Sequence, residues 1–282
     1  MVYSEQNIIL SEYRPFTKKW LYYSGDVVEY PAKFKNSFGE NNLIIFTTGT
    51  GISRNFSAII VNNIPNYHLM DTGQAYLRYD NSQNHTLLDN NSNIENNVLN
   101  IFGLTEDNIF FYVYGVLNSS EYKIKYANDL KKSSPRIPLL KNKEKYVEIG
   151  NKLANLHLNY ENQPSWNGVE VVISNSTPNY KVTKMKHPKK GVLDTIIYNE
   201  HITIKNIPEK AYEYIVNGRP AIEWIIDQYQ IKTDKKSGIT DDPNEFSDDP
   251  KYILNLLLSI ITVSMKTLEL IDELPEFEVV EA

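Results

Sequence analysis

The sequence of 282 residues contains no cysteine, and this absence excludes disulfide bonds and thiolate metal sites. A chain without cysteine fits a reducing compartment, so we expect a cytoplasmic protein. A secretory signal would need an apolar core near the start, where Ser4–Asn7 is polar, and the sequence therefore does not predict export. The longest apolar stretch, Tyr252–Ile271, is interrupted by polar and charged residues such as Asn255, Lys266 and Glu269, which favours a buried helix, disfavours a membrane span and predicts no membrane partner.

Motifs for catalysis are also missing. Thr47–Gly51 lacks the Gly-Lys-Ser/Thr ending of a phosphate-binding loop, so it predicts a turn. The acidic run Asp241–Asp249 lacks the spacing of a calcium loop and predicts a turn that caps a helix starting near Pro250. The Asn/Asp-Pro-Pro-Tyr/Phe tetrapeptide that adenine methyltransferases use is absent. The five histidines have no metal-binding spacing: His68, His85, His157, His187 and His201. We therefore expect this chain alone to catalyse nothing and to hold no metal or cofactor.

The charge is unevenly distributed along the chain. The formal net charge is -6, yet residues 241–282 contain 11 acidic and 2 basic residues. Between Ser120 and Lys190 there are 14 basic and 6 acidic residues. A positive region inside an acidic protein is what phosphate binding requires, although a lysine-rich face that serves solubility would have the same composition.

Hydrophobic periodicity predicts a mixed α/β (α+β) fold. Apolar runs predict strands in the first third, and later runs with several alternating positions predict a second set. We expect a twisted, largely antiparallel sheet with flanking helices and a helical C-terminal portion. The expected strands are Leu43–Phe46, Ser57–Val61, Asn66–Met70, Val169–Ile173, Tyr180–Met185, Val192–Tyr198 and Ile202–Ile204.

Longer amphipathic patterns predict helices. Two helices are expected to meet near Asn118, the second over Glu121–Lys132 with Ser119 or Ser120 as its N-cap. Glu144–Asn159 predicts another helix, on which His157 is expected to be packed or exposed, not catalytic. Residues 80–100 are dense in Asn and Ser and predict an exposed or poorly ordered loop.

The tract Gly218–Asn244 places a helical pattern after Pro220 and then a cluster of lysines before Gly238. Such a cluster meets a phosphate or is a solvated loop. The tract resembles the C-terminal specificity region of Type ISP restriction-modification enzymes. Tyr13–Tyr23, YRPFTKKWLYY, resembles a further segment of that family, with Thr17 where an acidic residue is usual. Tyr114–Leu140 resembles the family's helix that leads into a Pro-Arg-Ile-Pro turn.

The resemblance spans nearly the whole chain and implies a module that recognises a DNA target. In such enzymes the module presents double-stranded DNA to an upstream adenine methyltransferase, beside helicase-like and nuclease parts. S-adenosylmethionine, ATP and Mg²⁺ are implied for the intact parent only. On this basis residues 1–25 would follow the methyltransferase domain, 26–250 would form the recognition domain with a sub-boundary near 208, and 251–282 would form the C-terminal helix and acidic tail.

Basic clusters in these motifs give the candidate DNA contacts. We expect lysines and arginines to position phosphates, and Arg54 with Asn55 and the segment 179–190 to read bases. Arg14 and Arg219 have two interpretations, a contact with phosphate or a structural role. The candidates are Lys18, Lys19, Arg54, Asn55, Lys131, Lys132, Arg136, Lys184, Lys186, Lys189, Lys190, Lys235 and Lys236.

Two other functions compete with DNA recognition. The tyrosine-rich faces and the acidic tail also suit a protein-docking module that contacts the rest of an enzyme or a partner. A nuclease is disfavoured because the acidic run has no Glu-x-Lys partner. DNA binding that weakens with salt would favour recognition over both.

Overall fold

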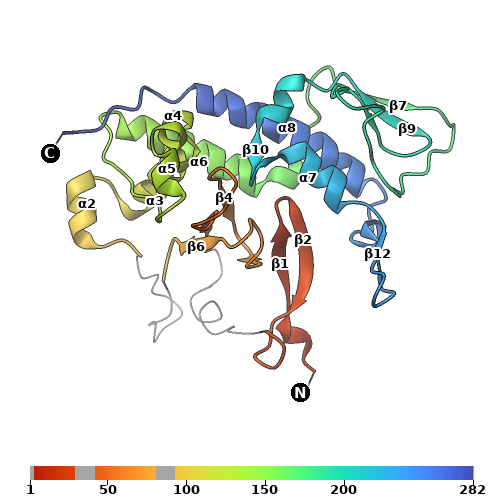
Figure 1. The fold of residues 1–282 in the computed structure, drawn as a ribbon, viewed down its shortest axis with the longest axis horizontal. Helices are drawn as coiled ribbons and strands as arrows, with labels where there is room; N and C mark the ends of the chain where they lie inside the picture. The colour runs from red at the N-terminus through yellow and green to blue at the C-terminus, as the bar shows by residue number, and fades with distance from the viewer. Residues whose placement is uncertain (1–2, 29–41, 81–92, 282) are drawn as a thin grey trace. The chain divides into compact units, whose positions relative to one another are not determined.

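A computed structural model describes residues 3–28, 42–80 and 93–281 (Figure 1). The chain divides into two compact units. Unit 1 comprises residues 1–158 and 270–282, and unit 2 comprises residues 159–269. Within the described ranges the strands form five small sheets, whose pairings are antiparallel except for a short parallel one between β1 and β5. The expected mixed α/β fold with antiparallel sheets and a C-terminal helix is confirmed.

Unit 1 begins with a hairpin and continues with a three-stranded sheet in the order β4-β3-β6 and a group of helices. Its strands are β1 (Ile8–Arg14), β2 (Thr17–Tyr22), β3 (Ile44–Thr47), β4 (Ala58–Val61), β5 (Ile64–Pro65) and β6 (Gln74–Leu77). Its helices are η1 (Glu5–Asn7), α2 (Asn96–Phe102), α3 (Glu106–Asn118), α4 (Ser120–Lys125), α5 (Ala127–Leu130) and α6 (Lys143–Leu158).

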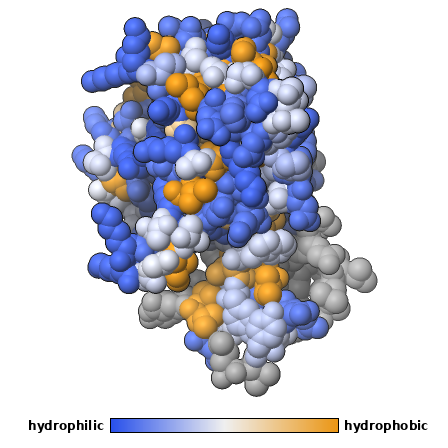
Figure 2. Space-filling model, turned by 90° about the vertical axis from the view of Figure 1, so that its right-hand side faces the viewer, coloured by the Kyte–Doolittle hydropathy of each residue, from blue (hydrophilic) through white to orange (hydrophobic). Residues whose placement is uncertain are grey.

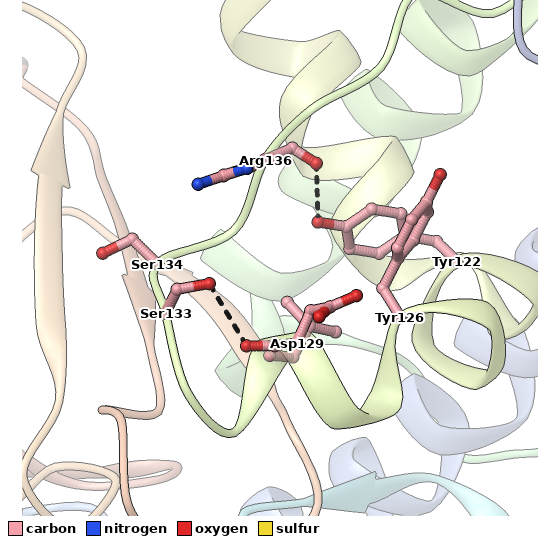
Figure 3. Close-up of a pocket in the computed structure, with 7 residues that line it drawn as sticks. Tyr122, Tyr126, Asp129, Ser133, Ser134 and Arg136 are labelled. Carbon is pink, nitrogen blue, oxygen red and sulfur yellow. Dashed lines mark hydrogen bonds between the residues drawn. The ribbon is translucent and has the colours of Figure 1, made fainter.

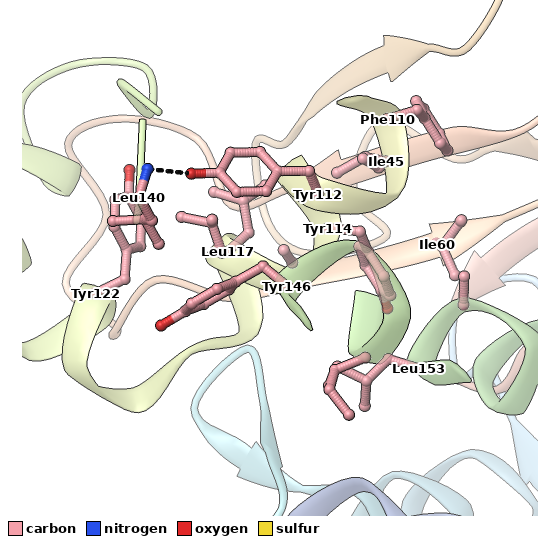
Figure 4. Packing of buried hydrophobic residues seen from close by; sticks show 14 of the residues in the cluster. Ile45, Ile60, Phe110, Tyr112, Tyr114, Leu117, Tyr122, Leu140, Tyr146 and Leu153 are labelled. Carbon is pink, nitrogen blue, oxygen red and sulfur yellow. Dashed lines mark hydrogen bonds between the residues drawn. The ribbon is translucent and has the colours of Figure 1, made fainter. Parts of the chain in front are cut away.

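The core of unit 1 lies where α3 and α6 pack together and against β4. Two glycines allow the helices to approach closely: a Cβ at Gly150 would lie 1.9 Å from the Phe111 carbonyl oxygen, and one at Gly115 would lie 2.4 Å from that of Tyr146. Buried tyrosines complete the core (Figure 4). The Tyr112 hydroxyl donates to the Pro138 carbonyl at 2.6 Å and accepts from the Leu140 amide at 3.0 Å, so its burial leaves no polar atom unpaired.

The junction near Asn118 follows the sequence pattern, but the expected helix Glu121–Lys132 is divided at Tyr126 into α4 and α5. α3 ends at Asn118, and the Ser119 side chain accepts a hydrogen bond from the Tyr122 amide as the N-cap of α4. His157 is buried, and its Nδ1 lies 2.5 Å from the Tyr114 hydroxyl. Burial, with the nearby charge of Lys123, lowers the pKa of His157 to about 3, so the ring is neutral at physiological pH.

The C-terminal residues return to unit 1. Val279 forms a β-bridge with Leu140, and the Val280 amide donates to the Leu139 carbonyl at 2.8 Å. Phe277 is buried against the rings of Tyr122 and Tyr126. Unit 1 is therefore assembled from both ends of the chain.

Unit 2 combines short hairpins, a three-stranded sheet in the order β7-β9-β8, and helices. Its strands are β7 (Glu170–Ile173), β8 (Ile196–Ile197), β9 (Ile202–Lys205), β10 (Ile215–Val216), β11 (Arg219–Pro220), β12 (Lys232–Thr233) and β13 (Thr240–Asp241). Its helices are η2 (Tyr160–Asn162), η3 (Glu209–Glu213), α7 (Ala221–Gln228), η4 (Pro243–Glu245) and most of α8 (Tyr252–Asp272).

The polar residues of α8 have structural partners within unit 2. Ser259 donates its hydroxyl to the Tyr160 carbonyl at 2.5 Å, and Thr262 donates to the Pro164 carbonyl at 2.7 Å. Among the described helices, α8 is long and apolar enough to cross a membrane by length and composition, but most of its apolar stretch is buried inside the protein. The Asp249 carboxylate accepts from the Lys251 amide at 2.9 Å, so the acidic turn meets the start of this helix as expected.

Four expectations about secondary structure are wrong. Asn66–Met70 is a turn, because the Asn66 side chain accepts from the His68 amide at 2.8 Å and replaces a strand partner. Tyr180–Met185 is irregular, and Val192–Tyr198 is a strand only at β8. Part of the Asn-rich region is the helix α2, which ends at Gly103 in the left-handed conformation. The middle of that region, residues 81–92, lies outside the described residues.

Candidate nucleic-acid interface

The basic residues fall into two classes according to whether the side chain forms an ion pair with a carboxylate. Arg78 pairs with Asp107, Lys145 and Lys152 pair with Glu148, and Lys141 pairs with Glu278. Nine of the predicted DNA contacts, by contrast, are exposed and have no ion pair or side-chain hydrogen bond within the described ranges. These nine are Lys131, Lys132, Arg136, Lys184, Lys186, Lys189, Lys190, Lys235 and Lys236. Because no carboxylate of the described residues neutralises them, they are available to phosphates.

Three of these residues lie on one surface of unit 1, in the segment 131–136 that follows α5. The amide of Gly51 donates to the Lys131 carbonyl at 2.9 Å and joins this segment to the loop 49–55. Gly51 has φ +77, a conformation that favours glycine, and Thr50–Gly51 forms the expected turn. The loop brings Asn55 and Arg54 into this part of unit 1; Arg54 lies 3.5 Å from Asp71 in an ion pair. We call the segment and the loop together the unit 1 basic surface.

A hollow of about 280 Å³ lies in this surface (Figure 3). Its lining combines two aromatic rings with hydroxyl, carboxylate and guanidinium groups: Tyr122, Tyr126, Asp129, Leu130, Ser133, Ser134 and Arg136. The Tyr122 hydroxyl donates to the Arg136 carbonyl at 3.0 Å, and burial raises the pKa of Tyr122 to about 12. The hydroxyl therefore remains a donor at physiological pH and fixes the backbone of Arg136.

Four of the unpaired lysines lie in the segment 181–190 of unit 2. The side chain of Asn244 both donates to and accepts from the backbone of Val182 at 2.8 Å, which explains why the expected strand does not form there. Val182 and Met185 are buried, while the lysines between and after them are exposed. The segment thus presents Lys184, Lys186, Lys189 and Lys190 to solvent on an anchored backbone.

The other two unpaired lysines, Lys235 and Lys236, lie in the turn between β12 and β13. The sequence predicts a loop here if the cluster is solvated, and the structure shows the turn of a hairpin. The Asp234 carboxylate accepts from the amides of Lys236 and Ser237 and from the Ser237 hydroxyl, and these hydrogen bonds lower the pKa of Asp234. The Ile231 amide donates to the Thr183 carbonyl at 3.0 Å, so the hairpin is attached to the lysine segment. We call the six unpaired lysines of the two segments the unit 2 lysines: Lys184, Lys186, Lys189, Lys190, Lys235 and Lys236.

The remaining candidates are placed differently. Lys18 and Lys19 point to opposite faces of β2, and the Lys19 ammonium lies 4.9 Å from the Tyr13 ring centre. Arg14 donates to the Tyr13 carbonyl at 2.7 Å and lies over the same ring. Arg219 pairs with Asp227 at 3.1 Å and lies over Trp224. These contacts favour the structural alternative for both arginines.

Two residues beside the unit 1 basic surface were not predicted from the sequence. Gln74 and Tyr76 of β6 lie beside the segment 131–136, because the Ser134 hydroxyl donates to the Gln74 side-chain oxygen at 3.1 Å. Ser134 and Gln74 are 60 positions apart, and no local pattern in the sequence joins them. Among the described residues, no group of three or more histidine, aspartate or glutamate side chains could hold a metal ion.

A view of one face of the molecule shows a mainly hydrophilic surface with small separate apolar groups (Figure 2). Some exposed apolar side chains gather on one face of the β1–β2 hairpin, where Ile8 is opposite Tyr22 and Leu10 is opposite Trp20. Trp20 is 72% exposed, and Tyr3, which stacks on Tyr22, is 63% exposed. We call these five residues the hairpin apolar face.

Comparisons with known proteins agree on one family. The family model "Type ISP C-terminal specificity domain" matches residues 1–256. A solved structure of a nuclease-deletion mutant of the Type ISP enzyme LlaGI, in complex with a DNA substrate mimic, is 58% identical with a TM-score of 0.89. The Type ISP enzyme LlaBIII, bound to DNA, is 55% identical with a TM-score of 0.93.

The matches cover nearly all of this chain but little of the relatives. Each covers 99% of this chain, with 22% of the LlaGI chain and 19% of the LlaBIII chain. A structure of the DrdV–DNA complex shares the fold at 24% identity, with a TM-score of 0.85 over 99% of this chain and 29% of that one. No curated protein matches. The chain belongs to the Type ISP C-terminal specificity domain family.

Proposed function

We propose that this chain recognises a specific sequence in duplex DNA and positions that DNA for a restriction-modification enzyme. The observation that carries the proposal is the separation of the basic residues into neutralised and unpaired sets. The nine unpaired residues belong to segments anchored by hydrogen bonds to neighbouring parts of their unit, so phosphate contacts would not have to order a flexible tail. Membership of a specificity-domain family supports the proposal, as do the solved relatives LlaGI and LlaBIII, whose structures contain a DNA substrate mimic and DNA.

In this proposal the two sets of unpaired cations hold the backbone while other side chains read bases. The unit 1 basic surface carries three of the cations and the unit 2 lysines provide six. The catalytic parts would belong to other regions of a longer enzyme. S-adenosylmethionine, ATP and Mg²⁺ would act in those regions, in the cytoplasm. This chain would determine which DNA sequence the enzyme binds.

The proposal is tested by fluorescence anisotropy of the purified chain with a randomised duplex pool at two salt concentrations, followed by sequencing of the bound fraction. We expect one asymmetric motif to be enriched and the affinity to fall as salt rises. Absence of any enrichment, with retention of DNA insensitive to salt, would contradict it.

The hairpin apolar face supports a second role, docking to a methyltransferase part of the same enzyme. Large aromatic side chains such as Trp20 and Tyr3 bury substantial apolar area when covered by a protein partner. The chain matches only about a fifth of the LlaGI and LlaBIII chains, so the longer relatives have ample further sequence to supply such a partner.

Docking predicts that Trp20→Ser weakens the association of this chain with the methyltransferase part of its parent, supplied as a separate polypeptide. Ile124→Ser is the matched control, because Ile124 is also exposed, at 77%, but lies on α4 away from the hairpin strands. We expect Trp20→Ser to raise the dissociation constant at least tenfold by calorimetry while Ile124→Ser leaves it unchanged. Equal effects of the two variants would refute docking at this face.

A further inference from the structure

The side chain of Gln74 is held in one orientation at the edge of a sheet. Among the described strands, β6 lies at the edge of its sheet, and Gln74 and Tyr76 are two residues apart, so they share one face of it. The Tyr76 hydroxyl donates to the Gln74 side-chain oxygen at 2.7 Å, and the Ser134 hydroxyl donates to the same oxygen at 3.1 Å. A carboxamide oxygen has two lone pairs, and both are used here. Gln74 therefore offers only the donors of its Nε2 group, for which the described residues provide no partner.

Arg136 offers donors from the neighbouring segment. Its carbonyl is fixed by Tyr122, whereas its exposed guanidinium has no ion pair within the described residues. Figure 3 shows the side chains of Arg136 and Ser134 extending to the same side of the segment. Ser134 is hydrogen-bonded to Gln74, and Arg136 lies two residues further along the same segment, so the two donor side chains project from neighbouring positions in unit 1.

The chemistry of this patch requires a ligand that offers hydrogen-bond acceptors, and among the bases it favours guanine. Guanidinium groups have no acceptor, and the acceptor of Gln74 is occupied, so the pair presents donors only. In the major groove guanine is the base that offers two acceptors side by side, N7 and O6, whereas adenine pairs an acceptor with a donor. Lys131 and Lys132 begin the same segment and are unpaired, which places cations for phosphates beside the donors.

We propose that Gln74 and Arg136 read a guanine from the major groove, with Tyr76 and Ser134 as positioning residues that keep the Gln74 oxygen occupied. The inference rests on the proposed DNA recognition and names part of its specificity. It also predicts that the enriched motif contains a G·C pair whose recognition depends on these two side chains.

The test repeats the sequencing of bound DNA with Gln74→Ala and Arg136→Ala. Each variant is expected to lower the preference for guanine at one position by about 5- to 150-fold and to leave the other positions unchanged. Replacing that guanine by 7-deazaguanine, which lacks the N7 acceptor, should weaken the wild type and have little effect on Arg136→Ala. Tyr76→Phe keeps the ring and frees one of the two lone pairs of the Gln74 oxygen, so we expect adenine to gain at the same position.

Two controls separate reading from other effects. Gln6→Ala removes an exposed glutamine of η1 and should leave the motif intact. Lys131→Ala should weaken binding to all sequences alike, with a salt slope smaller by about 1.

The outcomes distinguish the two levels of the proposal. A wild type that enriches a motif, with an unchanged motif in both Gln74→Ala and Arg136→Ala, would overturn the guanine assignment and leave DNA recognition standing. Insensitivity of the wild type to 7-deazaguanine at every guanine of the motif would also overturn it. A wild type without any sequence preference would overturn DNA recognition and the guanine assignment together.

Discussion

The salt dependence of DNA binding can be predicted from the unpaired cations. The logarithm of the binding constant falls linearly with the logarithm of the salt concentration, and each phosphate that a cation neutralises contributes about -0.9 to the slope. Nine contacts would give a slope of about -8 and a loss of affinity of about 70,000-fold between 50 and 200 mM salt. We therefore expect a steep dependence if these nine residues contact phosphates.

The informative perturbation removes the three unpaired candidate cations of unit 1 in the variant Lys131→Ala, Lys132→Ala, Arg136→Ala. If all three neutralise phosphates, the slope should fall to about -5 and the loss over the same salt range to about 2,000-fold. If Arg136 reads a base instead, only two phosphate contacts are lost and the magnitude of the slope should fall by about 2. A matched variant replaces Lys141, Lys145 and Lys152, which are also in unit 1 but have carboxylate partners. It changes the net charge by the same amount and should leave the slope nearly unchanged.

Anisotropy titrations at four or more salt concentrations measure both slopes. If the paired-lysine variant lowers the slope as much as the unpaired one, binding responds to overall charge and the division into two classes has no functional meaning. An unchanged slope in the unpaired variant would remove the unit 1 basic surface from the interface.

Two further predictions concern stability, measured by urea denaturation. Gly150→Ala should destabilise the protein by about 1–3 kcal/mol, because its Cβ would lie 1.9 Å from the Phe111 carbonyl oxygen. Helix propensity alone predicts that alanine stabilises this position. A more stable variant would therefore refute the close approach of α3 and α6. Burial lowers the pKa of His157 to about 3, so the unfolded chain binds a proton there between about pH 6.5 and 3 and the folded chain does not. Stability should therefore fall by up to about 3 kcal/mol as pH drops from 6.5 to 4, and His157→Gln should flatten this dependence; equal pH profiles would contradict it.

The sequence predicted those elements whose stability comes from a repeating apolar face. The helical spacing of Tyr146, Ile149 and Leu153 gave α6, and the apolar runs around Ile45 and Ile60 gave β3 and β4, because those side chains are buried together. Expectations were wrong where side-chain amides take over backbone hydrogen bonds. Asn244 satisfies Val182 from 62 positions away, and such a contact leaves no mark on the local pattern.

The candidate site was predictable in part for the same reason. Clusters of lysine are visible in any sequence, so Lys131, Lys132, Lys235 and Lys236 could be named. Which lysines are neutralised depends on long-range partners, as with Lys141 and Glu278. Gln74 has no significance in the sequence and acquires it from Tyr76 and Ser134 in the fold. Whether the named residues contact DNA stays a prediction.

The return of the C-terminal residues to unit 1 affects where this domain can be cut. The family match ends at residue 256, and a boundary drawn there would divide α8 and discard Phe277 and Val279. The damage would appear far away in sequence, since the rings of Tyr122 and Tyr126 would lose the Phe277 ring and Leu140 would lose its β-bridge. Tyr122 and Tyr126 also line the hollow beside Arg136. Loss of residues 271–282 by a nonsense mutation or a protease would therefore disturb this hollow, although the residues that line it remain in the chain.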